Sequence, residues 1–151
     1  MNLDEIFTQE RFDKGFVLKR AGEFSHDYNE SLPEDYIEFL THFNNSSLRS
    51  SKFLVTRSFE DGFEQSFYLE EIFSIDKTIE YYRLFFIAHP EPGLVDASVI
   101  PIAKLEGRTY ICLGIGLINQ GQIFLWDGDF GVTKQAETLM KFFNSLVVDE
   151  V

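Results

Sequence analysis

The order of apolar patterns along the chain constrains the fold more than any other feature of the sequence. Helical and strand-like patterns occupy, in order, residues 32–43, 53–56, 77–87, 98–103, 109–113, 122–127 and 133–147. The first, third and last of these patterns are helical, and the others are strand-like. Strands and helices do not alternate regularly, as they would in a parallel sheet. We therefore expect an α+β fold in which a mainly antiparallel, twisted sheet is flanked by helices.

Local signals indicate where the three helices begin. Ser31 and Glu34 have the spacing of a capping box, with Pro33 in the first turn. Asp76 predicts the start of the middle helix, and Thr133 predicts the start of the last one. The apolar stripe of the first helix comprises Tyr36, Phe39, Leu40 and Phe43, and that of the last comprises Ala136, Leu139, Met140, Phe143, Leu146 and Val147. The stretch 67–75 fits either a strand or a helix.

The length and composition of the chain fit one domain of ordinary size. The 151 residues contain no internal repeat and no linker, and 44% of them are hydrophobic, including 17 Phe and 6 Tyr. Each aromatic side chain can remove about 150–250 Å² from water, so the core needs no covalent staple. We expect a single domain over residues 1–151, with residues 1–30 as an N-terminal extension and 31–147 as the core.

The single cysteine and the N-terminal residues predict a cytoplasmic location. Cys112 cannot form an internal disulfide, and its apolar surroundings in sequence favour a buried, inert thiol. A chain without a disulfide framework suits a reducing compartment. Residues 1–6 lack the features of a signal peptide. No segment approaches the roughly 18 consecutive apolar residues that a membrane span needs.

The charge balance limits the classes of partner. With 25 acidic against 13 basic residues, the formal net charge is −12. Such a surface repels phosphate backbones and anionic lipid head groups, so we expect no direct nucleic-acid or membrane binding. The same field attracts basic proteins. Two interpretations stay open: the acidity keeps the protein soluble, or it matches a cationic partner.

Motifs that resemble cofactor sites lack their essential companions. Gly114 and Gly116 match half of a dinucleotide fingerprint, but a strand pattern follows where a helix is required. Asp127, Asp129 and Gly131 lack the spacing and the final Glu of a calcium loop. We therefore expect no cofactor and no metal.

Candidates for catalysis are equally weak. The three histidines have no metal-ligand spacing, and 25 acidic residues make chance carboxylate pairs inevitable. We expect the protein not to be an enzyme. A small hydrolase that uses Cys112 or a carboxylate pair remains the less favoured alternative.

Acidic and aromatic residues interleave in the middle of the chain. Phe59, Phe63, Phe67 and Tyr68 fit either the core or an interface, since interfaces favour aromatic anchors inside a polar rim. The acids of this segment predict a docking surface for Lys and Arg of a partner. The predicted partner-binding residues are Glu60, Asp61, Glu64, Glu70 and Glu71, with Asp127 and Asp129 as weaker candidates.

Several short motifs, taken in order, resemble the SUKH superfamily. The first is Leu32-Pro33 followed by an aromatic residue at position 36, and the helix keeps only the Asn of the family's closing Asn-Gly-Gly. The later motifs are Ile100-Pro101-Ile102-Ala103, Tyr110 to Leu113, and Trp126-Asp127. Members of this superfamily include bacterial toxin-immunity proteins and a fungal cell-wall regulator. The resemblance implies one twisted sheet flanked by helices.

The resemblance also implies a function for bacterial members, which bind and block a cognate toxin, often a nuclease. Together with the acidic surface, it predicts an immunity-type protein that occludes a basic toxin domain, with carboxylates imitating phosphates. The alternative is a regulatory scaffold that binds a protein other than a toxin. Aromatic-rich edges also allow a homodimer.

Overall fold

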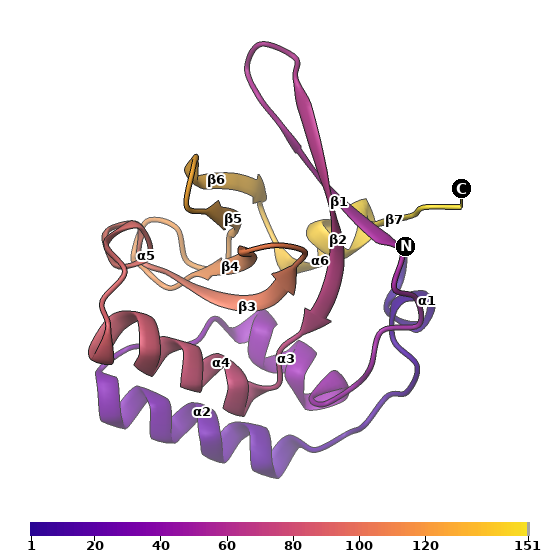
Figure 1. The fold of residues 1–151 in the computed structure, drawn as a ribbon. Coiled ribbons are helices and arrows are strands. Elements are labelled where there is room, and N and C mark those ends of the chain that lie inside the picture. Colours follow the sequence, from indigo (N-terminus) through magenta and orange to yellow (C-terminus); the bar gives the residue numbers. More distant parts are fainter. Residues whose placement is uncertain (151) are drawn as a thin grey trace.

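The computed structural model describes residues 1–150 and shows one antiparallel sheet covered by helices (Figure 1). The helical elements are α1 (Leu3–Ile6), α2 (Lys14–Tyr28), α3 (Glu34–Phe43), α4 (Ile75–Tyr82), the π-helical segment η1 (Arg83–Ala88), α5 (Pro92–Ala97) and α6 (Leu139–Ser145). The strands are β1 (Phe53–Ser58), β2 (Glu64–Ile72), β3 (Val99–Leu105), β4 (Thr109–Gly114), β5 (Ile123–Asp127), β6 (Gly131–Ala136) and β7 (Val147–Val148).

The seven strands lie in the order β6-β5-β4-β3-β2-β1-β7, and every neighbouring pair is antiparallel. This arrangement confirms the predicted α+β class. Of the ambiguous stretch 67–75, residues 67–72 belong to strand β2, and Ile75 begins helix α4. No helix among residues 1–150 is both long and apolar enough to cross a membrane.

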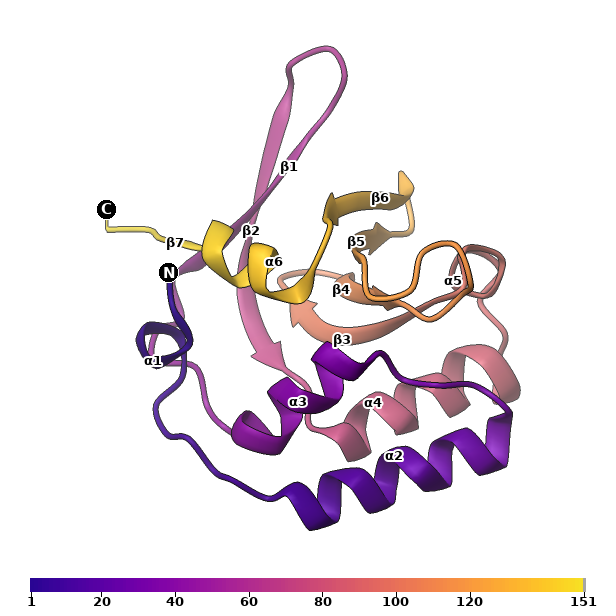
Figure 2. The same ribbon diagram turned by 180° about the vertical axis from the view of Figure 1, so that it is seen from behind.

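Two apolar clusters pack on the sheet. The larger one joins the sheet to α2, α3, α4 and α6, and its fully buried members include Tyr36, Leu40, Ile111 and Leu125. The smaller cluster surrounds Cys112 and includes side chains from η1 and α5. Figures 1 and 2 show α2, α3 and α4 along one side of the sheet and α6 beside β7.

Residues before position 31 take part in this packing. Ile6 and Phe7 are buried in the larger cluster, and α2 buries Val17, Ala21 and Phe24 there. Phe7 lies 5.1 Å from Phe43, measured between ring centroids. The N-terminal segment therefore supplies part of the core.

All three predicted helix starts are wrong in detail. Helix α3 begins at Glu34, directly after Pro33, and the Ser31–Glu34 capping box does not form. Ser74 caps α4 in place of Asp76, because its Oγ accepts a hydrogen bond from the Lys77 amide at 3.2 Å. The start of α4 shifts because any nearby Ser, Thr or Asp can offer a cap, and tertiary packing selects one. Helix α3 has Pro33 at its N-cap and no side-chain cap.

The last helix is shorter than predicted. Residues from Gly131 to Ala136 form the edge strand β6, in which Thr133 pairs with Leu125 of β5. Pairing with β5 commits this backbone to the sheet, so Thr138 caps α6 instead, accepting from the Lys141 amide at 3.1 Å. Of the predicted stripe, only Leu139 and Phe143 are buried within α6, which ends at Ser145. Met140 is exposed, and Val147 belongs to strand β7 in place of the helix.

Candidate functional site at the outer end of the hairpin

The β1–β2 hairpin extends beyond the rest of the sheet (Figure 1). On one side, β3 pairs with β2 only from Leu69 to Ile72. On the other side, β7 pairs with β1 only at Phe53 and Leu54. Residues 55–67, here called the outer hairpin, thus form a two-stranded ribbon. Two-stranded ribbons are marginally stable by themselves, so this one needs support from side chains.

Arg57, on the β1 strand of the outer hairpin, supplies that support. Its side chain is 1% exposed, and its Nη1 donates to Oδ2 of Asp127 at 2.5 Å. Its Nη2 donates to Oε1 of Gln65, also at 2.5 Å. The guanidinium lies 4.8 Å from the Phe59 ring and 5.0 Å from the Phe130 ring. Arg57 therefore ties the hairpin to the β5–β6 turn by charge and by ring contacts.

Asp127 organises the turn that it closes. Its Oδ1 accepts hydrogen bonds from the amides of Asp129 at 2.8 Å and Phe130 at 2.7 Å. Burial by itself would raise the pKa of Asp127, but these hydrogen bonds and the Arg57 guanidinium hold that pKa below its ordinary value. Both carboxylate oxygens are thus occupied within the molecule, which makes Asp127 a support for the site.

A third side chain links the two regions. The Gln135 side chain on β6 donates to the Thr56 carbonyl on β1. Strands β1 and β6 are not neighbours in the sheet. The twisted sheet therefore brings its β6 edge toward the hairpin.

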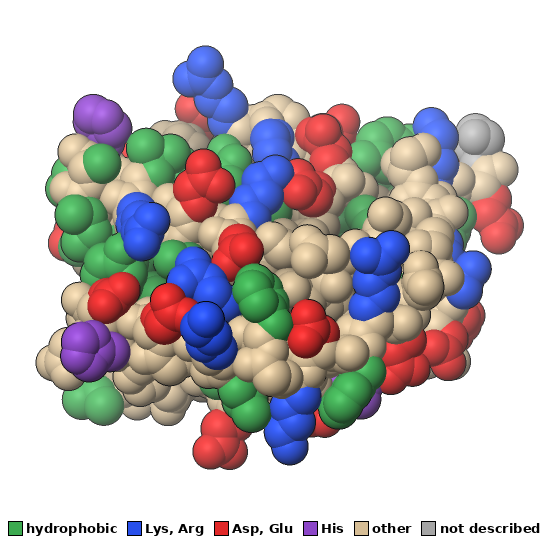
Figure 3. Space-filling model, turned by 90° about the horizontal axis from the view of Figure 1, so that it is seen from below, with side chains coloured by type: hydrophobic (Ala, Val, Ile, Leu, Met, Phe, Trp, Pro, Cys, Tyr) green, Lys and Arg blue, Asp and Glu red, His purple; other side chains and the backbone are tan. Residues whose placement is uncertain are grey.

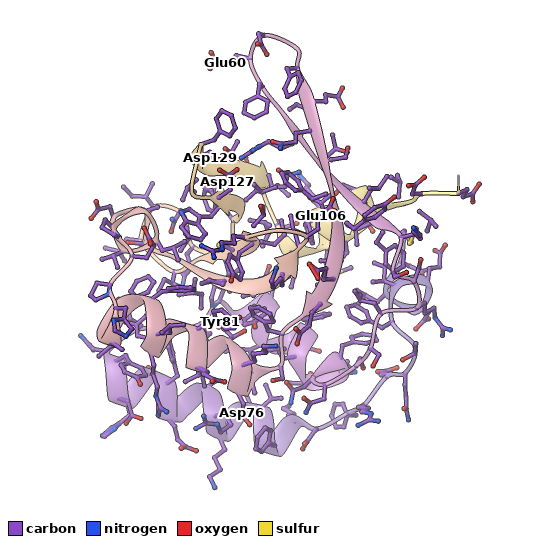
Figure 4. All side chains as sticks on the ribbon, viewed as in Figure 1. Glu60, Asp76, Tyr81, Glu106, Asp127 and Asp129 are labelled. Carbon is purple, nitrogen blue, oxygen red and sulfur yellow. The ribbon has the colours of Figure 1, made fainter. Side chains whose placement is uncertain are left out.

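The predicted acids fall into two separate groups. Glu60, Asp61 and Glu64 are exposed on the outer hairpin, and Asp129 is exposed on the β5–β6 turn. Figure 4 labels Glu60 and Asp129 at this end of the molecule. None of these four carboxylates forms an ion pair within residues 1–150. One end of the molecule thus carries negative charge that nothing in the described chain neutralises.

Glu70 and Glu71 belong to the other group, at the inner end of β2. Glu70 pairs with Lys104 at 3.5 Å, and Glu71 pairs with Lys77 at 2.8 Å. Both line a separate hollow of about 280 Å³ beside Asn45 to Leu48. The structure does not bring these two residues to the outer hairpin.

The interleaved aromatic residues divide between core and surface. Phe63 is 61% exposed and Phe130 is 62% exposed, and the half-buried Phe59 lies between them, with ring centroids 5.7 Å from Phe63 and 5.2 Å from Phe130. Phe67 is buried in the larger cluster. The half-buried Tyr68 bonds through its hydroxyl to Asp149. Sequence reasoning missed Phe130, although it directly follows one of the candidate acids.

A cleft of about 420 Å³ opens between the hairpin and the two facing turns. It is lined by Arg57, Gln65, Ser66, Phe67, Glu106, Gly107, Thr109, Asp127, Asp129 and Phe130. Glu106, which sequence reasoning also missed, lies in the β3–β4 turn and accepts a hydrogen bond from the Tyr68 amide at 3.1 Å. Only the fold could reveal this residue, since many exposed acids share its local sequence features.

The residues considered for chemistry have structural roles. Cys112 is fully buried, and burial raises its thiol pKa. A Cβ atom at Gly114 would lie 2.1 Å from the Asn119 carbonyl oxygen, so this glycine permits a tight loop. Among residues 1–150, no three His, Cys, Asp or Glu side chains are placed to hold a metal ion.

The opposite end of the molecule has a different surface. Figure 3, which views the molecule from below, shows basic and acidic side chains interspersed. One example is Arg20 on α2, which bonds to Asp76 on α4 at 2.7 Å. Unpaired acids within residues 1–150 also occur outside the hairpin, as at Asp13 next to Phe12, which is 66% exposed. At the hairpin end, such acids adjoin the contacting rings of Phe59, Phe63 and Phe130.

Comparisons with known proteins place this fold in a family. A search of curated proteins found no match. The model of the SMI1 / KNR4 family (SUKH-1) matches residues 22–145, which extend from within α2 to the end of α6. The motifs from Leu32 to Trp126 correctly predicted the SUKH superfamily, and the chain belongs to its SMI1/KNR4 family (SUKH-1).

Proposed function

We propose that this protein is an immunity-type binding protein of the cytoplasm that blocks a basic toxin domain by covering its active site. The observation that carries the proposal is the outer hairpin, where the exposed rings of Phe63 and Phe130 stand beside unpaired carboxylates. Family membership supports a protein–protein role, since the SUKH group includes toxin-immunity proteins.

The two kinds of side chain have different tasks in this proposal. Aromatic rings that become fully buried at an interface supply much of its binding energy. The carboxylates of Glu60, Glu64 and Asp129 steer a cationic partner and select against acidic ones. In a nuclease toxin, the partner's basic groove would accept these carboxylates in place of phosphates.

The proposed mechanism is occlusion without chemistry. The Ser66 hydroxyl at the cleft bonds to the Thr56 hydroxyl and, within residues 1–150, to no carboxylate, and the Cys112 thiol is buried away from solvent. We accordingly propose a non-enzymatic role. A hydrolase that uses Cys112 as its nucleophile is disfavoured, because burial raises the pKa of this thiol and a protonated thiol is a poor nucleophile.

Co-expression with candidate toxin domains tests the proposal. Cells should survive when the wild-type protein is present, and the two proteins should co-purify. The double variant Phe63→Ala/Phe130→Ala should fail to protect. Phe12→Ala, which alters a residue 66% exposed outside the site, should protect like the wild type.

The salt dependence of association provides a second test. Association with a toxin domain should slow steeply between low and physiological ionic strength, because screening weakens steering between exposed charges. A flat dependence would rule out electrostatic docking. If the protein protects cells against none of the toxin domains but co-purifies with another basic protein, the regulatory scaffold is favoured.

A further inference from the structure

The backbone of β2 has an open edge beside the cleft. In an antiparallel pair, successive residues direct their N–H and C=O groups to opposite sides of the strand. Strand β2 pairs with β1 through register partners such as Arg57 and Gln65. The Tyr68 carbonyl faces the other side, where it accepts from the Glu106 amide at 2.9 Å. By this alternation, Ser66 and Glu64 also direct their backbone groups away from β1.

Nothing in the described chain covers these groups as a strand. Strand β3 ends at Leu105, and the chain then turns through Glu106 and Gly107, which has a φ of 73°. The cleft of about 420 Å³ begins at this turn, and Ser66 lines it. An extended segment placed in the cleft would continue the line of β3 alongside β2.

The charges at the cleft define the segment that fits. Its single lining cation, Arg57, is already bonded to Asp127. Glu106 and Asp129 line the same cleft and form no ion pair among residues 1–150. Glu64 adds a further exposed carboxylate at the open edge. An acidic segment would be repelled, and a segment that carries Lys or Arg would be attracted.

We propose that an extended, basic segment of the partner protein binds in this cleft as an added β-strand, pairing with β2 at Ser66 and Glu64. Such strand addition takes its affinity from backbone hydrogen bonds and its selectivity from side chains. The inference rests on the proposed function for the identity of the partner. The open edge and the cleft themselves do not depend on it.

A peptide probe tests the proposal directly. The probe is a capped heptapeptide of alternating lysine and valine, titrated into the ¹⁵N-labelled protein. The amide signals of Ser66, Glu64 and Gly107 should shift, and the Ser66 amide should exchange with solvent more slowly. A glutamate–valine peptide should not bind. Neither should a lysine–valine peptide with N-methyl groups on alternate backbone amides, because it cannot complete the ladder.

Two proline variants supply a matched comparison within the protein. Ser66→Pro removes the outward N–H on the cleft side of the hairpin, whereas Thr56→Pro removes an outward N–H on the opposite edge. Both lose the 2.9 Å contact between the Thr56 and Ser66 hydroxyls. Ser66→Pro should weaken lysine–valine peptide binding by about tenfold or more, and Thr56→Pro by less than about twofold.

The outcomes separate this inference from the proposed function. Equal binding of the methylated and unmodified peptides would overturn strand addition, even if Ser66→Pro fails to fold. If Ser66→Pro folds and neutralises a toxin as well as the wild type does, the inference fails while the immunity role stands. If the lysine–valine peptide binds at Ser66 but no toxin is blocked, the immunity role fails while the strand site stands.

Discussion

The inner and outer halves of the β1–β2 hairpin are held by different forces. The inner half lies between β7 and β3, where the backbone pairs on both sides and Leu69 is fully buried. The outer half lacks strand neighbours and is held by the Arg57–Asp127 ion pair and by ring contacts. The outer half can therefore present exposed rings and acids to solvent. Because side chains, rather than a neighbouring strand, hold it in place, one edge of β2 stays open.

The acids of the two halves differ in the same way. Glu71 on the inner half is matched by Lys77, whereas Glu60 and Glu64 on the outer half have no basic partner within residues 1–150. Exposed, matched pairs contribute little to stability. Unmatched acids repel one another slightly, so the acids of the outer half do not stabilise the fold, and we propose that they act in binding.

The Arg57–Asp127 ion pair acts as a clamp on the outer hairpin, and breaking it should produce the largest effect. Asp127→Asn leaves the fully buried Arg57 charge without its counter-ion, which costs about 3–5 kcal/mol when a buried pair is broken. Urea unfolding measures the loss, and hydrogen exchange should show residues 55–67 opening first. Glu137→Gln, which breaks the exposed pair with Lys134, should cost less than about 1 kcal/mol. A similar cost for both variants would contradict the clamp.

Removing an exposed ring should separate binding from stability. Phe63→Ala should weaken toxin binding by about 2 kcal/mol, since central aromatic side chains are typical hot spots. It should change the free energy of unfolding by less than about 0.5 kcal/mol, because the ring is 61% exposed. Calorimetric titration and urea unfolding give the two numbers. Loss of stability in place of affinity would assign Phe63 to the core.

Neutralising the two acidic groups compares the halves directly. The triple variant Glu60→Gln/Asp61→Asn/Glu64→Gln should slow association with a toxin domain about tenfold at low salt. Glu70→Gln/Glu71→Gln should change the rate far less, because lysines already balance those charges. Stopped-flow measurements at several salt concentrations provide the rates. Equal slowing by both variants would mean that overall charge, rather than its location, drives docking.

The pH dependence of stability should report on the clamp. The pKa of Asp127 is lower in the folded protein, so its contribution is complete above the ordinary aspartate value of about 3.9. That contribution is lost as the pH falls through the lowered folded-state pKa. The stability difference between wild type and Asp127→Asn should therefore shrink on acidification below about pH 4. A constant difference would show that the Asp127 charge is not responsible.

The smallest effect is expected from chemical labelling of Cys112, which lies in strand β4 inside the sheet. Cys112 is fully buried and its thiol pKa is raised, so a thiol reagent should not label the native protein at neutral pH. The reagent should label the protein quantitatively in denaturant. Mass spectrometry counts the added groups. Rapid labelling of the native protein would show that the sheet around Cys112 opens more readily than its packing indicates.

Local sequence patterns predicted much of the fold. The stripe from Tyr36 to Phe43 lies on the buried face of α3, and the three runs after residue 98 form β3, β4 and β5. These predictions succeed because helix and strand periodicities are properties of neighbouring residues. The prediction fails at Thr133, where an apolar spacing suited to a helix belongs to an edge strand that pairs with β5.

The candidate site could be predicted only in part. Acids interleaved with aromatics pointed to residues near Glu60 and Phe63, and the structure brings these together with Asp129 and Phe130. The same reasoning grouped Glu70 with them, because sequence proximity does not reveal that a nine-residue strand separates its two ends.

The sequence by itself determined the fold class, the surplus of negative charge and the aromatic supply for the core, since these follow from composition and short-range spacing. The tertiary structure decided which acids stay unmatched and which rings stay exposed. At the outer hairpin, this arrangement depends on the hydrogen bond between Arg57 and Asp127, which are 70 positions apart in the chain. Only the twist of the sheet creates this contact, because it brings the β5–β6 turn up against a hairpin that no local pattern connects to it.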